Sequence, residues 1–197
     1  MVIYTQRVEE VESYQERRDC ADQNIPRFLQ ACGYLPVPMP NVVEEPAAFV
    51  ELLQPVGIVL TGGNSIQRYG GTAPERDHTD ACMIEAAIKN NIPVYGFCRG
   101  MQSILDYFGC ELEVVEHHVA VRHIVHGAWG DMEVNSYHNL ACRRVTKQLR
   151  IMAQAEDSVV EAVMADNYPI MGSMWHPERE NPFADKDIER IKELFLS

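Results

Sequence analysis

The sequence predicts an α/β fold in which a mainly parallel sheet is flanked by helices. In the first half of the chain, short apolar runs alternate with helical patterns, as is typical of strands joined by crossover helices. No repeat, linker or low-complexity segment divides the 197 residues, and that length is common for one domain. We therefore expect one domain over residues 1–197.

The first half supplies four short strands, each an apolar run next to a turn signal or a proline: 2–4, 35–37, 57–60 and 93–97. Helical spacing is found over 15–32, where Pro26 leaves open one helix or two shorter ones. Residues 77–90 place apolar side chains on one helical face, and 102–108 read as a short helix. Alternation of this kind predicts a flavodoxin-like parallel sheet.

The second half is richer in strands, which we expect at 112–115, 132–134, 159–164 and 170–175. An amphipathic helix over 187–196 closes the chain. These later strands either extend the parallel sheet or form an antiparallel flap.

Composition excludes several classes of protein. The formal net charge is 17 − 29 = −12, which argues against non-specific binding to nucleic acid or to an anionic membrane surface. We find no apolar run long enough to span a membrane and no secretory leader. Six cysteines form no C-x-x-C pair, which favours a reduced, cytoplasmic protein.

A cysteine occupies the junction between a strand and a helix. The strand 93–97 runs into the segment G-F-C-R-G, with Cys98 at its centre, and then into a helical pattern. This is the cysteine form of a nucleophile elbow, a sharp turn that lifts the side chain above the sheet. The helix N-terminus favours the thiolate and offers the backbone N–H of Arg99 to an oxyanion. The alternative is that Cys98 is a small core residue.

A histidine and a carboxylate follow the apolar run 170–175. Pro177 restricts His176 to an extended conformation, and residues two apart on an extended chain point the same way. Glu178 can then accept a hydrogen bond from one ring nitrogen of His176 while the other faces Cys98. The pattern predicts a nucleophile, a base and an orienting carboxylate, although a lone histidine is often structural.

Segments 96–102 and 175–178 together resemble the class I glutamine amidotransferase superfamily, in particular its free-standing gamma-glutamyl hydrolase branch. Three further segments are similar to that branch, namely an oxyanion-hole loop, YGE and ERD elements and an NS-x-H segment, at 60–65, 69–77 and 134–138. The resemblance covers about residues 5–178. It implies cysteine-dependent hydrolysis of a gamma-glutamyl amide through a thioester, with release of glutamate and without a cofactor.

The resemblance also implies a role for individual residues. Cys98, His176 and Glu178 are the expected catalytic residues, and Gly63 and Arg99 the expected oxyanion hole. The residues expected to contact the substrate are Gln102, Ser136, His138, Tyr69, Arg76 and Arg179. Asn64 departs from the polar residue that this branch often carries at its position.

Several arginines lie near the motif loops: Arg17, Arg18, Arg68, Arg76, Arg122 and Arg179. They either pair with the acidic surface or clamp a phosphate, which Arg forks bind well. Together with Arg7, Tyr14 and Tyr69, they make the chain look like the bacterial hydrolases that cleave gamma-glutamyl-CDP-amidate in capsule phosphoramidate synthesis.

A histidine-rich stretch contains His117, His118, His123 and His126. Because neither cysteine nor carboxylate stands at a recognised ligand spacing, we expect pocket-lining or structural roles and no metal.

The expected partner is a small gamma-glutamyl substrate, and a homodimer is left open. Three alternatives remain: the glutaminase subunit of a two-chain amidotransferase, a gamma-glutamyl-GABA-type hydrolase, and a non-catalytic binding or stress protein on this fold. The intact 175–178 segment counts against the last.

Overall fold

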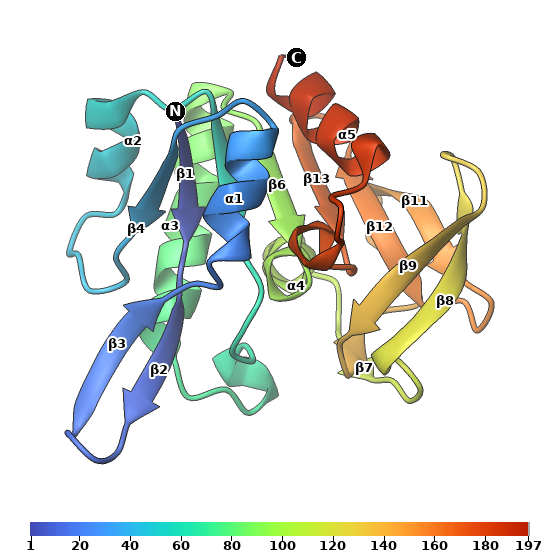
Figure 1. Cartoon of the computed structure of the whole chain (residues 1–197), viewed down its shortest axis with the longest axis horizontal. Helices are drawn as coiled ribbons and strands as arrows, with labels where there is room; N and C mark the ends of the chain where they lie inside the picture. The colour runs from blue at the N-terminus through green and yellow to red at the C-terminus, as the bar shows by residue number, and fades with distance from the viewer. Residues whose placement is uncertain (197) are drawn as a thin grey trace.

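A computed structural model describes residues 1–196. Its main sheet has nine strands in the order β4-β1-β5-β6-β13-β12-β11-β8-β9 (Figure 1). The strands are β1 (Val2–Thr5), β4 (Pro36–Met39), β5 (Gly57–Leu60), β6 (Val94–Phe97), β8 (Val119–Gly127), β9 (Met132–Tyr137), β11 (Leu149–Ala155), β12 (Val160–Ala165) and β13 (Ile170–Ser173). The helices are α1 (Asn24–Ala31), α2 (Ala47–Leu53), α3 (Pro74–Asn90), α4 (Arg99–Tyr107) and α5 (Asp185–Phe195).

The first five strands in this order are parallel, and their sequence order is that of a flavodoxin-like sheet. From β13 onward every neighbouring pair is antiparallel. The expectation of a mainly parallel sheet flanked by helices is confirmed, and the later strands extend that sheet.

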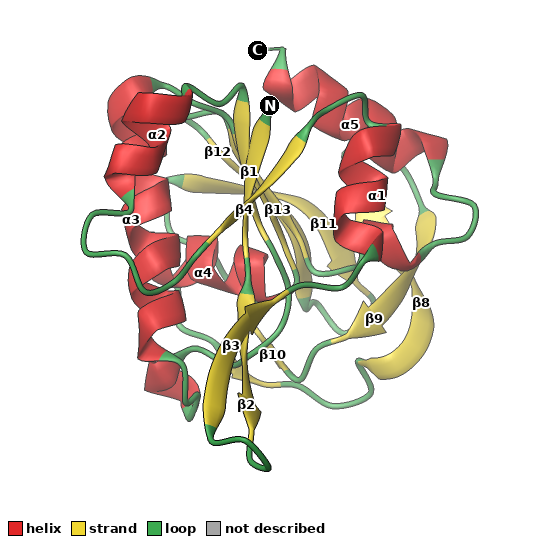
Figure 2. Cartoon of the chain, turned by 60° about the vertical axis from the view of Figure 1, so that its left-hand side comes forward, coloured by secondary structure: helices red, strands yellow, loops and turns green. Residues whose placement is uncertain are grey.

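Strands β1, β5, β6 and β13 are fully buried, and because successive side chains point to opposite sides, these strands are covered on both faces. On one side Ile3 packs with residues of α3 and α4, such as Met83 and Met101. On the other side Val2 packs with residues of α1 and α5, such as Phe28. Figure 2 shows the helices on the two faces. The sheet is thereby held rigid where β6 ends.

The antiparallel strands enclose a third, smaller core that includes Val125, Val134 and Trp175. Two short pairs complete the fold: β2 (Arg7–Val11) with β3 (Glu16–Cys20), and β7 (Glu113–Val114) with β10 (Leu140–Ala141). Within residues 1–196, no helix is long and apolar enough to cross a membrane. The six cysteines are free thiols.

The helix expected over 15–32 is wrong in its first part. Residues 16–20 form β3, and the helix starts only at Asn24, because its apolar positions begin at Ile25. Pro26 does not divide this helix, since it lies in the first turn, where its missing N–H has no partner to lose. Helix α2 and strands β8 and β11 were not predicted from the sequence.

Candidate active site

Cys98 occupies the turn between β6 and α4, with φ 51° and ψ −112°. A positive φ is strained for a residue with a side chain, and such strain concentrates where a turn presents a functional group. An added Cβ at Gly100 would lie 1.9 Å from the carbonyl oxygen of Leu60, so the turn closes only with glycine there. The N–H of Cys98 donates to the carbonyl of Ser173 at 2.8 Å, which ties the turn to β13. The sharp strand-to-helix turn expected at Cys98 is therefore present, and the role of Cys98 as nucleophile stays a prediction.

His176 follows β13, the parallel neighbour of β6. Its backbone is extended, as the following Pro177 requires. Its Nδ1 lies 2.7 Å from Oε1 of Glu178, and both side chains are buried. Glu178 reaches the imidazole from the short 3-10 helix η2 (Pro177–Arg179), not from an extended chain as expected. The pair was expected from the sequence, but the backbone that forms it was not.

The surroundings of His176 favour its protonated form. Burial by itself would lower the pKa, but the charge of Cys98, a hydrogen bond with that residue and the Glu178 carboxylate raise it from 6.5 to about 9. An imidazolium next to a sulfur stabilises the thiolate. The arrangement can therefore provide a nucleophilic sulfur and a proton donor at one point.

Three side chains that the sequence did not connect with His176 hold it in place. Asn135 in β9 accepts from the backbone N–H of His176 at 2.9 Å and donates to its carbonyl at 2.8 Å. The rings of Phe97 and Tyr137 meet the imidazole edge-on, with centroids 5.7 and 5.6 Å away. Asn135 lies 41 residues from His176, so only strand pairing could reveal this contact.

The loop after β5 passes directly beside the catalytic candidates. An added Cβ at Gly62 would lie 2.9 Å from Cε1 of His176 and 3.6 Å from the Cβ of Cys98. Gly63, the expected oxyanion-hole residue, has φ +93° and lies against the side chain of Arg7. Gly62 is thus the residue of this loop that packs on the reacting groups, while the oxyanion role of Gly63 stays a prediction.

Asn64 does not face the reacting groups. Its side chain accepts from the N–H of Val8 at 2.8 Å and donates to the Val8 carbonyl at 2.9 Å. This residue, which departs from the family pattern, therefore attaches the loop to β2.

Arg76 and Arg99 form a buried ionic cluster with Asp80. Arg76 and Asp80 are 0% and 1% exposed and lie 3.1 Å apart, and Arg99 contacts both Asp80 and Asp77. Arg76 also donates to the carbonyl of Thr61 at 2.7 Å. This contradicts the expected contact of Arg76 with substrate, because a fully enclosed guanidinium that is paired with a carboxylate cannot reach a ligand. Arg76 instead supports the loop before Gly62. The Arg99 side chain anchors α4 to α3, and its backbone N–H remains the predicted oxyanion donor.

Three residues expected to contact the substrate have buried side chains with protein partners. Gln102 donates to the carbonyl of Leu140 at 2.9 Å, and the Ser136 hydroxyl donates to the carbonyl of His118 at 2.7 Å. His138 places Nε2 3.2 Å from Oε1 of Glu161. These contacts direct the three side chains into the protein interior, so their predicted contacts with substrate find no support in the structure.

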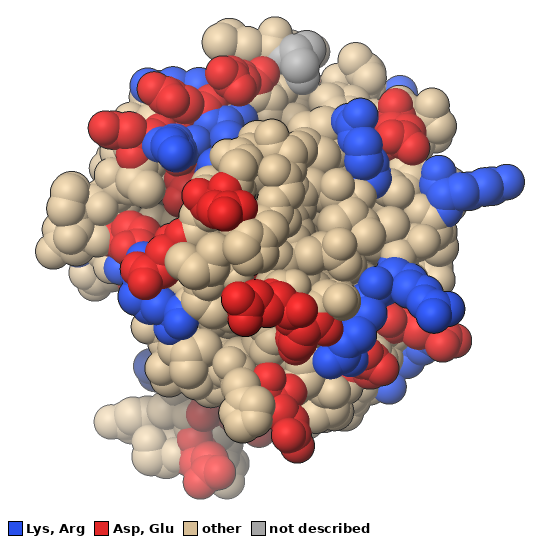
Figure 3. Space-filling model, turned by 90° about the vertical axis from the view of Figure 1, so that its right-hand side faces the viewer, with Lys and Arg blue, Asp and Glu red and all other residues tan. Residues whose placement is uncertain are grey.

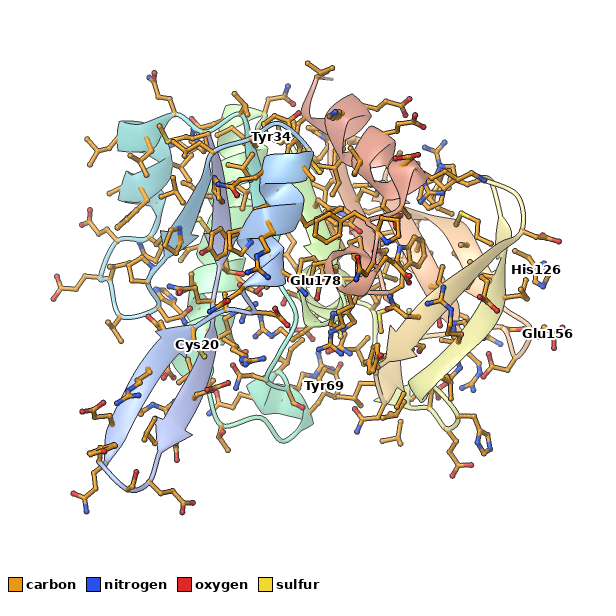
Figure 4. The ribbon with its side chains drawn as sticks, viewed as in Figure 1. Cys20, Tyr34, Tyr69, His126, Glu156 and Glu178 are labelled. Carbon is orange, nitrogen blue, oxygen red and sulfur yellow. The ribbon has the colours of Figure 1, made fainter. Side chains whose placement is uncertain are left out.

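A hollow of about 50 Å³ opens beside His176 and Glu178. Arg179 lines it, as expected, with its guanidinium 4.3 Å from the ring centre of Tyr137 and its Nε 3.8 Å from Glu178. Arg7 lines it as well; the sequence placed this residue in the segment that resembles the CDP-amidate hydrolases but gave it no site role. Figure 4 shows Glu178 near the middle of the molecule. A larger, mostly apolar hollow of about 510 Å³, lined by segments of β12, β13 and α5, contains none of the catalytic candidates.

The remaining arginines near the motif loops pair with surface carboxylates. Salt bridges join Arg17 to Glu10 and Glu75, Arg18 to Glu16, Arg68 to Asp106, and Arg122 to Glu133 and Glu180. On the face shown in Figure 3, basic side chains are interspersed with acidic ones. Tyr69 uses its hydroxyl to accept from the N–H of Leu112 at 3.1 Å. Pairing with the acidic surface thus accounts for these four arginines.

Part of the histidine-rich stretch meets a carboxylate that spacing did not reveal. His118, His123 and His138 surround Glu161 of β12, at 3.1 to 3.4 Å from its Oε1. His126 lies elsewhere and pairs with Asp131.

Comparison with known proteins adds to this geometry. The family described as "Glutamine amidotransferase class-I" matches residues 18–192. The chain is 30% identical to the gamma-glutamyl-CDP-amidate hydrolase of Campylobacter jejuni, over 97% of this chain and 95% of the relative. It is 31% identical to the gamma-glutamyl-gamma-aminobutyrate hydrolase PuuD of Escherichia coli, over 77% of each chain.

A solved structure has a similar fold. A GMP synthase component from Thermoplasma acidophilum superimposes with a TM-score of 0.71 at 19% identity, over 99% of this chain and 92% of the other. At that identity the likeness concerns the fold alone. The family match spans most of the sequence, and the Campylobacter relative aligns over nearly all of it. The chain therefore belongs to the class I glutamine amidotransferase family.

Proposed function

We propose that the chain hydrolyses a gamma-glutamyl amide with Cys98 as nucleophile, His176 as general acid and base, and Glu178 as the carboxylate that orients the imidazole. The observation that carries the proposal is the Cys98 elbow beside a buried His176 whose Nδ1 lies 2.7 Å from Glu178. The names of the two hydrolase relatives point to the same class of substrate.

In the first step the Cys98 thiolate adds to the amide carbonyl. The backbone N–H of Arg99, at the N-terminus of α4, and the loop at Gly63 are the proposed donors to the oxyanion. The imidazolium of His176 then gives its proton to the leaving nitrogen, the C–N bond breaks, and a thioester remains.

In the second step His176, now neutral, takes a proton from water, and the hydroxide adds to the thioester carbonyl. The C–S bond breaks, glutamate leaves, and the thiolate–imidazolium pair is restored. Because Glu178 holds Nδ1, the Nε2 atom is the one that exchanges the proton in both steps.

For the leaving group we propose a phosphate-bearing amine, as in gamma-glutamyl-CDP-amidate. Arg7 and Arg179 both line the hollow beside Glu178, and an arginine fork suits phosphate oxygens. A capsule phosphoramidate pathway is the setting that this substrate would imply. A gamma-glutamyl-GABA conjugate is the alternative within the same chemistry, and it needs no phosphate contact.

A second candidate is the glutaminase subunit of a two-chain amidotransferase. The glutamine-hydrolyzing component of the GMP synthase of Thermococcus kodakarensis is 26% identical over 87% of this chain and 93% of the relative. A component of that kind needs a partner for full activity, whereas a free-standing hydrolase does not.

The test is to incubate the isolated chain with glutamine, gamma-glutamyl-GABA and gamma-glutamyl-CDP-amidate and to measure free glutamate. We expect steady turnover and the highest kcat/KM for the nucleotide conjugate. Turnover of glutamine alone would favour the glutaminase role, and preference for gamma-glutamyl-GABA would overturn the phosphate assignment. If no compound is hydrolysed by the wild type, the proposed function fails.

A further inference from the structure

A cluster of three histidines surrounds one buried carboxylate outside the proposed catalytic site. We call His118, His123, His138 and Glu161 the histidine cluster. His118 precedes β8, His123 lies in it, His138 follows β9, and Glu161 belongs to β12. The side chains of His118, His138 and Glu161 are 4%, 0% and 0% exposed. The proposed hydrolysis uses none of these four side chains.

The nitrogen atoms approach the carboxylate at one point. Three nitrogen atoms lie close to Oε1 of Glu161: Nδ1 of His118 at 3.1 Å, Nε2 of His123 at 3.4 Å and Nε2 of His138 at 3.2 Å. Two ligands that are each about 2.1 Å from a tetrahedral ion stand about 3.4 Å apart. The distances of the three nitrogen atoms from Oε1 therefore match the spacing of neighbouring ligands on one metal ion, and the ligand atoms of His118, His138 and Glu161 all lie within 4.8 Å of one another.

Hydrogen bonds within the protein do not satisfy the cluster. Three polar atoms of the cluster are buried and have no hydrogen-bond partner at a favourable angle: Nδ1 of His118, Nε2 of His123 and Oε2 of Glu161. Buried polar atoms normally have a partner, so each unsatisfied one calls for an explanation. A cation among these atoms satisfies them together, since imidazole lone pairs and a carboxylate are all metal ligands.

An outer carboxylate supports the same interpretation. Oδ2 of Asp157 lies 3.2 Å from Nε2 of His118. A neutral His118 that donates from Nε2 to Asp157 keeps the lone pair on Nδ1, the nitrogen that faces Glu161. Histidines that bind metals usually donate their other ring N–H to a carboxylate in this way.

We propose that the histidine cluster binds one divalent transition-metal ion, with Zn²⁺ as the best match. Three neutral imidazoles and a carboxylate suit Zn²⁺ and its first-row neighbours better than Ca²⁺ or Mg²⁺, which take oxygen ligands. The two carboxylates of Glu161 and Asp157 balance the charge of the ion. His118, His138 and Glu161 supply three ligands, and the partly exposed His123 would turn toward the ion to complete a tetrahedral shell, which makes the site structural. A hollow of about 320 Å³, lined by His118, His123 and Asp157, gives access from solvent.

The proposed ion would join the strands that hold the catalytic histidine. Its ligands come from segments next to β8, β9 and β12, and β9 carries Asn135, which holds the backbone of His176. The carbonyl of Glu161 accepts from the N–H of Met174, two residues before His176. The ion is therefore expected to stabilise this part of the fold and to act on turnover only through the position of His176.

The test measures metal binding directly, because zinc also binds thiolates. We would use the Cys98→Ala variant, strip it with a chelator, and titrate Zn²⁺ by calorimetry and Co²⁺ by visible absorbance. We expect one ion per chain, a tetrahedral Co²⁺ spectrum without thiolate bands, and a higher Tm with metal. No bound ion, or thiolate bands in the spectrum, would overturn the proposal, and the first result would mean that a protonated histidine balances Glu161.

Variants locate the ion. In the same background, His138→Ala and Glu161→Gln are expected to weaken binding at least about 100-fold, and Asp157→Asn about 10- to 100-fold. His126→Ala is the matched control, since His126 pairs with Asp131 at the outer edge of β8 and should bind like the parent (Figure 4). If His138→Ala or Glu161→Gln does not fold, the metal affinity is measured instead on variants of the partly exposed His123 and of Asp157. Unchanged affinity in His123→Ala and Asp157→Asn would place the ion elsewhere and refute the site.

Discussion

Glu178 offers the sharpest test of the proposed chemistry, because its replacement by glutamine keeps the shape and removes the charge. The pKa of His176 is raised from 6.5 to about 9, a difference of about 2.5 units, and His176 is largely buried. At about 1.4 kcal/mol per pKa unit, its surroundings stabilise the imidazolium by roughly 3 kcal/mol after the opposing effect of burial is subtracted. Cys98 and Glu178 are the groups that supply this stabilisation.

If Glu178 supplies about a third to a half of this amount, Glu178→Gln lowers kcat/KM roughly 10-fold and moves the pKa of His176 down by about 1 unit. His176→Ala removes the acid and base altogether and should cost about 10²- to 10⁴-fold. In the wild type, the raised pKa keeps His176 protonated up to about pH 9. The alkaline limb of kcat/KM therefore falls near pH 9 in the wild type and at lower pH in Glu178→Gln.

The assay measures kcat/KM for a chromogenic gamma-glutamyl anilide across pH 6 to 10 for the wild type and both variants. This range contains both the ordinary pKa of histidine, 6.5, and the raised pKa of His176, about 9. Near-ultraviolet circular dichroism checks that each variant is folded. A Glu178→Gln enzyme with wild-type kcat/KM and an unmoved alkaline limb would show that this carboxylate does not orient the base.

Three further predictions test the other parts of the site. Cys98→Ala should abolish glutamate release and leave Tm nearly unchanged; residual turnover above a trace would remove Cys98 as nucleophile. Arg7→Ala and Arg179→Ala should each lower kcat/KM for the nucleotide conjugate about 10- to 100-fold, the value of one hydrogen bond to a charged group, and spare the anilide; equal effects on both substrates would argue against phosphate binding. Arg76→Ala should destabilise the fold by about 1.5–3 kcal/mol in urea unfolding, since Asp80 keeps Arg99 but loses one of its two guanidinium partners, and a change below about 0.5 kcal/mol would contradict that role.

The elbow could be predicted from the sequence because its determinants are local. Gly96 and Gly100 are required by close backbone contacts within a few residues of Cys98 or on the adjacent β5. The contact between His176 and Glu178 is local as well, and it formed although the chain turns into a 3-10 helix there. A short-range pattern thus predicted the contact between His176 and Glu178 even where the backbone conformation was misjudged.

The substrate residues were predicted less well, because their roles depend on what lies across the fold. Arg76 follows a loop that resembles a substrate-binding element, yet it turns inward to Asp80 one helical turn away. Arg7, in the edge hairpin β2–β3, comes beside Gly63 only because Asn64 attaches the loop to β2. Neither the inward turn of Arg76 nor the position of Arg7 beside Gly63 can be predicted from the spacing of nearby residues.

The helix wrongly expected over 15–20 has a similar cause. Polar residues in that segment fit either a solvated helix or an exposed hairpin, and pairing with Arg7–Val11 decides for the hairpin. Asn135 makes two hydrogen bonds to the backbone of His176, and no pattern in the sequence indicates them because the two residues are far apart in the chain.

The change from parallel to antiparallel pairing at β13 accounts for how the site is assembled. A nucleophile at the end of β6 needs a base at the end of an adjacent parallel strand, and β13 provides it because both carboxyl ends lie at one edge. A parallel neighbour on the far side of β13 would require another crossover helix, which would cover the sheet there. In the described part of the chain, no helix lies between β8 and β13, and the antiparallel strands return Asn135 and Tyr137 to the imidazole. The second half of the chain therefore holds His176, the proposed base, while the first half presents Cys98, the proposed nucleophile.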